Sequence, residues 1–201
     1  MYSIKSEFIK ELEVEHSRFI GIIMPISNKD DIKKIITDVK KRFPKAKHYC
    51  YATIIDNFQK SSDDGEPQGT AGRPMLDLLT KCELNNVILI VVRYFGGILL
   101  GASRLLRTYV ETSDLVIKSA TLFKVCNGFS YHITTSYTNY DALIRKCKAG
   151  GVIVENTVFN ENIELLVFSE NDIVKEFMEQ FYQDTKIDFL KNKVIYKKVE
   201  E

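Results

Sequence analysis

The chain has 201 residues, of which 45% are hydrophobic and 11% aromatic, enough for the core of one large domain or two small ones. Its 28 Lys and Arg nearly balance its 27 Asp and Glu, so the net charge of +1 neither indicates nor excludes a nucleic-acid partner. The longest apolar run, residues 87–92, is far shorter than the roughly 20 residues of a membrane-spanning helix. The first residues also lack the apolar segment of a signal peptide. We therefore expect a cytoplasmic monomer with no membrane partner.

The cysteines are scattered along the chain and form no CxxC pair, which argues against a zinc ribbon or a redox dithiol. Free cysteines in cytosolic proteins are usually buried and stay reduced. We expect free thiols, no bound metal and no cofactor. The four cysteines are Cys50, Cys82, Cys126 and Cys147.

The first half of the chain predicts a mixed domain of strands and helices. Alternating apolar residues predict two antiparallel strands at its start, and helical spacing then predicts a helix with Asn28 as its N-cap and Pro44 as its stop. A Ser-, Asp- and Gly-rich stretch further on predicts a long loop. In chain order, the expected elements are strands 2–14 and 18–24, helix 29–43, strand 47–56, loop 57–72, helix 73–83, strand 86–95 and helix 99–119.

The second half restarts the pattern and predicts the order β-α-β-β-α-β, which is the ferredoxin-like order. We therefore predict two domains, at residues 1–123 and 124–201. The expected elements of the second are strand 121–134, helix 136–149, strands 152–159 and 162–169, helix 171–183 and strand 187–199.

A glycine-rich turn, 96-GGILLGAS-103, lies between a predicted strand and a predicted helix and nearly matches a P-loop. Ala102 occupies the position of the lysine that reaches the phosphates in a P-loop, so we exclude a nucleoside-triphosphate site. Gly96, Gly97 and Gly101 still predict a tight turn before a helix N-terminus, where free backbone N–H groups attract anions.

Three arginines flank this turn. Arg93 ends the preceding strand, and Arg104 and Arg107 share one face of the following helix. Together with Tyr94 and Phe95 as stacking rings, they predict a site for the phosphates of a nucleic acid. The alternative is that the arginines pair with acids of a neighbouring loop.

The loop 63-DDGEPQGTAGRP-74 supplies those acids, with three carboxylates in four positions. It fails the pattern of an EF-hand calcium loop. Acid–base chemistry together with His48 would make the protein a hydrolase, but no nucleophile is evident. We favour an organising role, in which the loop bridges to the arginines. The residues assigned to it are His48, Asp63, Asp64, Gly65, Glu66, Gly69, Thr70 and Arg73.

Three strings, 48-HYCYA-52, 63-DDGEPQGTAGRPML-76 and 91-VVRYFGGILLGASRLLRTY-109, strongly resemble the IMPACT family. The resemblance covers about residues 1–120, and the second half is similar to the small C-terminal domain of the bacterial members. Ser103-Arg104 departs from the glycine pair usual in the family, which adds positive charge beside the turn.

The resemblance implies an α+β protein built of two-layer α/β sandwiches. The N-terminal domain would be ribosomal-protein-like, similar to domain IV of elongation factor G, with a left-handed βαβ crossover that breaks the usual rule. The ferredoxin-like C-terminal domain would be similar to domain V of that factor.

Such modules suggest a non-catalytic, translation-associated regulator that binds RNA or the ribosome, in a stress response. The segment 29–47 supports this reading because it holds eight Lys or Arg against three Asp. Two alternatives stay open. One is the hydrolase that uses His48 with Asp63, Asp64 or Glu66, and the other is a module that binds a protein partner through the glycine turn.

Overall fold

The computed structural model describes residues 1–181 and 183–199. By their internal contacts these residues divide into two compact units, one formed by Met1–Lys124 with Lys198 and Val199, the other by the described residues of Val125–Lys197. The assignment of 1–123 and 124–201 as domains stays a prediction. Within the described residues, no helix has both the length and the apolar character needed to span a membrane.

The first unit is built on an antiparallel sheet of five strands in the order β2-β3-β6-β4-β5. Neighbouring strands are antiparallel throughout, and β3 pairs with β6 from Arg18 to Pro25. The strands are β2 (Phe8–Val14), β3 (Ser17–Pro25), β4 (His48–Ile55), β5 (Phe58–Ser62) and β6 (Val87–Tyr94).

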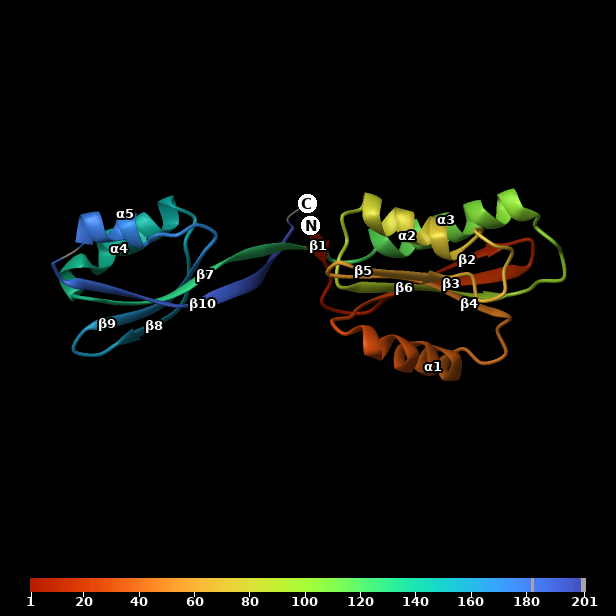
Figure 1. The fold of residues 1–201 in the computed structure, drawn as a ribbon, viewed down its shortest axis with the longest axis horizontal. Helices are drawn as coiled ribbons and strands as arrows, with labels where there is room; N and C mark the ends of the chain where they lie inside the picture. Colours follow the sequence, from red (N-terminus) through yellow and green to blue (C-terminus); the bar gives the residue numbers. More distant parts are fainter. Residues whose placement is uncertain (182, 200–201) are drawn as a thin grey trace. The chain divides into compact units, whose positions relative to one another are not determined.

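Helices cover both faces of this sheet, with α1 (Ile32–Arg42) on one face and α2 (Gly72–Lys81) and α3 (Ala102–Lys118) on the other (Figure 1). Alternate side chains of β6 belong to the two cores: Leu89 packs on the α2 and α3 side, and Ile90 on the α1 side. A strand buried on both faces reads as a continuous apolar run. The unit therefore has three layers, with the sheet between α1 and the pair of α2 and α3, and the two-layer sandwich that the resemblance implies is wrong for this unit.

Two local predictions are corrected. The start of the predicted loop 57–72 is strand β5, which forms a hairpin with β4 through a turn at Asp56, where φ is +50°. As an edge strand with exposed side chains, β5 needs no apolar pattern. The predicted helix 99–119 begins only at Ala102, because Gly101 has a left-handed φ of +74°.

The start of α1 follows the prediction. The side chain of Asn28 accepts a hydrogen bond from the Asp30 N–H at 3.0 Å and caps a short 3-10 turn that leads into the helix. The first predicted strand is divided, because Tyr2–Ser3 form a separate short strand, β1, that pairs with Phe123 and Lys124.

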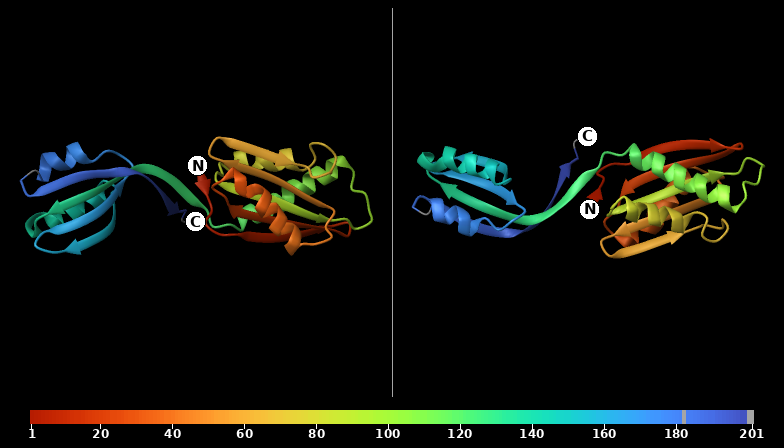
Figure 2. Two further views of the ribbon diagram at one scale, coloured as in Figure 1. Left: turned by 60° about the horizontal axis from the view of Figure 1, so that its bottom comes forward. Right: turned by 90° about the horizontal axis from the view of Figure 1, so that it is seen from above.

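The second unit has the predicted β-α-β-β-α-β element order, with strand neighbours β10-β7-β9-β8. Leu143 of the first helix and Phe177 of the second join one core with the sheet, and the ribbon views show both helices on one face (Figures 1 and 2). The likeness to domains of elongation factor G and the hand of the crossover stay predictions. The elements are β7 (Phe123–Thr135), α4 (Tyr137–Ala149), β8 (Ile153–Phe159), β9 (Ile163–Ser169), α5 (Val174–Phe181) and β10 (Thr185–Lys198).

Candidate functional site

The acidic loop is folded around the side chain of Asp63. Its carboxylate accepts hydrogen bonds from the backbone N–H groups of Gly69 at 2.9 Å, Ala71 at 3.0 Å and Gly72 at 2.8 Å. The last two groups lie at the start of α2, where N–H groups have no partner within the helix and a negative charge is favourable. Asp63 therefore caps α2 and closes the loop.

Glu66 lies inside the unit and is only 8% exposed. Its carboxylate accepts two hydrogen bonds from Nη1 of Arg93, at 2.8 and 3.1 Å, and one from the Tyr109 hydroxyl at 2.8 Å. Nε2 of His48 lies 3.8 Å from Oε2 of the same carboxylate. A buried charge is tolerated only when it is paired and hydrogen-bonded, and these partners meet that condition.

His48 and the next residue of β4 hold the loop from the other side. Nδ1 of His48 is 2.8 Å from the carbonyl oxygen of Asp64, an acceptor, so Nδ1 donates the proton. The Asp64 carboxylate accepts from the backbone N–H of Tyr49 at 2.7 Å. The loop is thus attached to β4 at both its main chain and its side chain.

A thiol and a phenol complete the buried network. The Cys50 thiol donates to the Asp63 carbonyl oxygen at 3.0 Å and lies 3.3 Å from the Tyr109 hydroxyl. Burial raises the pKa of Cys50 to about 12, and it also raises the pKa of Tyr109. Both groups stay protonated near neutral pH, so Cys50 is not present as a reactive thiolate.

Special backbone conformations shape the loop. Gly65 and Gly69 have left-handed φ angles of +85° and +78°. Thr70 donates from its hydroxyl to the Pro67 carbonyl at 2.7 Å.

Arg73, by contrast, lies outside the network: its Nε pairs with Asp77 at 2.9 Å, and its side chain is 72% exposed.

The three arginines near the glycine turn lie in different surroundings. Arg93 is 5% exposed and paired with Glu66, so its guanidinium is not available to a phosphate at the surface. Arg104 pairs with Glu15 at 2.7 Å, and the two side chains are 55% and 38% exposed. Arg107 is exposed and has no acidic partner within the described residues. Arg104 and Arg107 do line one shallow hollow of about 580 Å³ at the start of α3.

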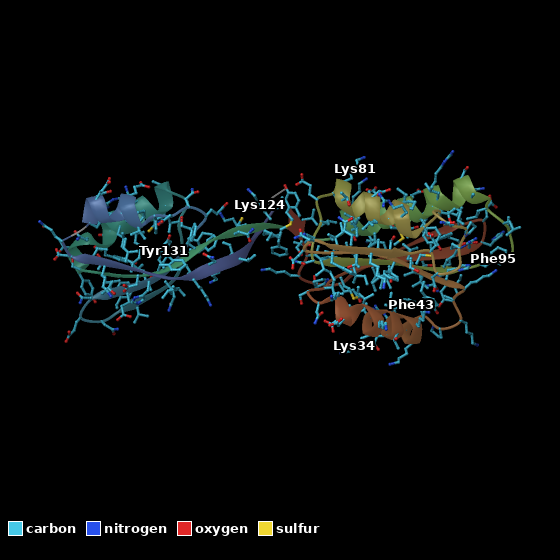
Figure 3. All side chains as sticks on the ribbon, viewed as in Figure 1. Lys34, Phe43, Lys81, Phe95, Lys124 and Tyr131 are labelled. Carbon is cyan, nitrogen blue, oxygen red and sulfur yellow. The ribbon has the colours of Figure 1, made fainter. Side chains whose placement is uncertain are left out.

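The glycine turn itself is tightly packed at one end. A Cβ on Gly96 would lie 2.1 Å from the carbonyl carbon of His16, whereas Gly97 has open space and a φ of +88°. Tyr94 is half-buried and donates from its hydroxyl to the Pro44 carbonyl at 3.1 Å. Phe95 is 39% exposed at the end of β6 (Figure 3).

Sequence reasoning missed Tyr109 as a member of the network. Its position on α3, in a stripe of buried residues with Leu105 and Val116, is also what an ordinary core tyrosine would show. The hydroxyl was the available signal, since a buried tyrosine usually finds a hydrogen-bond partner.

Glu66, Arg93 and Tyr109 form the buried centre of this network, whereas Asp64 is exposed at its rim. Among the residues that the structure describes, no group of three or more His, Cys, Asp or Glu side chains is arranged to hold a metal ion.

Residues 15–117 match the model of the Impact N-terminal domain. The chain is 31% identical over 186 residues to the IMPACT family member YvyE of Bacillus subtilis, covering 89% of this chain and 83% of that protein. It is 33% identical over 143 residues to the IMPACT family member YigZ of Escherichia coli, covering 67% and 70%. A crystal structure of an hypothetical protein has the same fold, with a TM-score of 0.62 at 24% identity over 94% of this chain and 97% of that one.

The chain therefore belongs to the IMPACT family, and the family resemblance seen in its sequence is confirmed.

Proposed function

We propose that this protein is a non-catalytic, translation-associated regulator that binds RNA or the ribosome. The role in translation follows from what membership of the IMPACT family implies, and the stress response remains part of the same proposal.

One observation carries the proposed binding. Of the eight cations in 29–47, Lys41 and Arg42 pair with acids, and the other six have no acidic partner within the described residues. All six are exposed. Lys34, for example, lies on the outer side of α1, away from the sheet (Figure 3). Unpaired surface cations gain by binding phosphates, because binding releases counterions. The six are Lys29, Lys33, Lys34, Lys40, Lys45 and Lys47.

The geometry of the acidic loop supports a role without catalysis. The carboxylates of Asp63 and Asp64 accept hydrogen bonds from backbone N–H groups, and Glu66 is buried with Arg93. A general base has to reach the proton that it abstracts. A hydrolase that used Asp63 or Glu66 would have to break these hydrogen bonds before either carboxylate could reach a substrate.

Co-sedimentation with ribosomes at about 50 and 200 mM salt tests the proposal. Wild type should pellet with ribosomes at the lower salt and be released at the higher. The variant Lys34→Glu/Lys45→Glu should bind at least about tenfold more weakly and show a salt slope reduced by about 2. The matched control, Lys10→Glu/Lys81→Glu, changes the net charge equally on exposed positions of β2 and α2.

The outcomes separate the possibilities. Wild type that stays in the supernatant at low salt contradicts the proposed binding, and equal losses in both variants contradict the assignment to α1. A further variant, Arg104→Ala/Arg107→Ala, tests the hollow at the start of α3. Arg93→Ala is unsuitable for this purpose because it leaves Glu66 unpaired in the interior.

Docking of a protein partner through the glycine turn is a second candidate, favoured by one observation. Leu99 is 86% exposed and Ile98 42% exposed in the turn, and Phe95, at the start of the turn, is 39% exposed. Several exposed apolar side chains in one short segment are a feature of interaction sites. A partner that is captured by wild type after nuclease treatment, but not by Leu99→Ser, would favour this candidate over RNA.

A further inference from the structure

A groove of about 780 Å³ lies between α1 and the outer hairpin of β4 and β5. Two of the side chains that line it are aromatic, Tyr51 and Phe58, and three are lysines, Lys29, Lys33 and Lys60. Phe58 is 37% exposed, so part of its ring is open to solvent. The groove is separate from the buried network and from the glycine turn.

The strand register explains why both rings lie on the α1 side of the sheet. Ile55 pairs with Phe58 and Thr53 with Lys60, so these four side chains project to one face. Tyr51 has the same parity on β4 and packs against the α1-side core together with Ile55. Within the described residues β5 is the edge strand, so no further strand lies beside Phe58 and Lys60.

The lysines flank the rings on both sides. Lys29 and Lys33 are four residues apart and line the groove from the start of the α1 segment, and Lys60 lines it from β5. Asp30 is the single acidic residue in the lining. Within the described part of the chain, none of the three lysines forms an ion pair, so their charges are available to a ligand.

We propose that this groove binds an unpaired RNA strand, with bases stacked on Phe58 and Tyr51 and phosphates held by the lysines. The inference rests on the proposed function and names the RNA feature that the protein recognises. Aromatic rings beside a cationic track are the usual means of holding single strands, because every base has a π-face. In a duplex those faces are covered by neighbouring bases, so a duplex cannot use the rings.

The test is fluorescence anisotropy of the full-length protein with a labelled oligo(U) and with an RNA duplex of equal length. Wild type should bind oligo(U) more tightly than the duplex. Phe58→Ala should weaken oligo(U) binding about 5- to 150-fold, the effect of one lost stacked base. The matched control Phe159→Ala removes an exposed ring of the second unit, 57% exposed, and should leave binding unchanged. Circular dichroism checks that each variant is folded.

A second variant tests the same groove without removing the Phe58 ring, so its effect on RNA binding does not depend on how the protein repacks around that ring. Lys60→Glu changes an exposed charge on the edge strand and should reduce the salt slope of oligo(U) binding by about 1. Unchanged oligo(U) affinity in both folded variants overturns the groove, as does a duplex that binds wild type as tightly as the single strand. Displacement of oligo(U) by poly-glutamate at equal charge would instead assign the groove to an acidic protein segment.

The two proposals fail in different ways. If wild type sediments with ribosomes but does not bind oligo(U), the groove inference is wrong and the proposed function stands. If wild type does neither, both are wrong.

Discussion

Arg93 and Glu66 form an ion pair inside the first unit, with Nη1 2.8 Å from Oε1 and the two side chains 6% and 3% exposed. The pair joins the end of β6 to the acidic loop, and His48 reaches the same carboxylate from β4. The three sequence strings that carry the family resemblance therefore meet at one carboxylate. Together these contacts hold the acidic loop against the sheet.

Arg93→Ala should lower the free energy of unfolding by about 3 to 5 kcal/mol, because it leaves the Glu66 carboxylate buried without its cation. Urea denaturation followed by circular dichroism measures the change. The matched control is Arg73→Ala, which removes an exposed arginine paired with Asp77 and should cost no more than about 1 kcal/mol. A loss for Arg93→Ala as small as that of the control would contradict the structural role of the pair.

Local patterns in the sequence were sufficient for much of the fold. The apolar run of β6 predicts a buried strand, since a strand covered on both faces carries apolar residues at every position. The cap at Asn28 and the β-α-β-β-α-β order of the second unit also depend on neighbouring residues alone. Such features are visible in a single sequence because they are decided within a few residues.

Other features depend on residues that are distant along the chain. Arg93 lies 27 positions from Glu66, so the sequence left open whether the arginine pairs with the loop or binds phosphate. The structure answers differently for each arginine: Arg93 is buried with the loop, Arg104 pairs with Glu15, and Arg107 is exposed. The polar strand β5 escaped prediction because its conformation follows from pairing with β4 rather than from its own residues.

Gly96 and Gly97 should respond very differently to the same substitution. Gly96→Ala should destabilise the protein by about 3 kcal/mol or more, because the added Cβ would meet the backbone of His16 at 2.1 Å. Gly97→Ala meets no neighbouring atom and carries only the cost of a left-handed φ of +88°, about 1 to 2 kcal/mol. Thermal denaturation of the two variants makes the comparison. Equal losses would contradict the close contact of the turn with the hairpin of β2 and β3.

Cys50 should be the thiol most strongly protected by the fold. Burial raises its pKa from an ordinary value of 9.0 to about 12. Ionisation would also break the hydrogen bond that the thiol donates to the Asp63 carbonyl oxygen. In native protein at pH 8, a thiol reagent should modify the half-buried Cys82 first and Cys50 only on unfolding. Mass spectrometry of samples taken at successive times identifies the modified cysteine. If Cys50 and Cys82 are labelled at equal rates in native protein, the burial of Cys50 is contradicted.

The same shift predicts how stability depends on pH. Because the folded-state pKa of Cys50 is raised, the contribution of this thiol to the free energy of unfolding is fully present below pH 9 and is lost as pH rises toward 12. Between these values the free energy of unfolding should fall by about 1.4 kcal/mol per pH unit through this thiol. Urea denaturation at pH 8 and pH 10 measures the fall, and Cys50→Ala should show a smaller one. If wild type and Cys50→Ala lose the same stability between the two pH values, the thiol is not the group responsible.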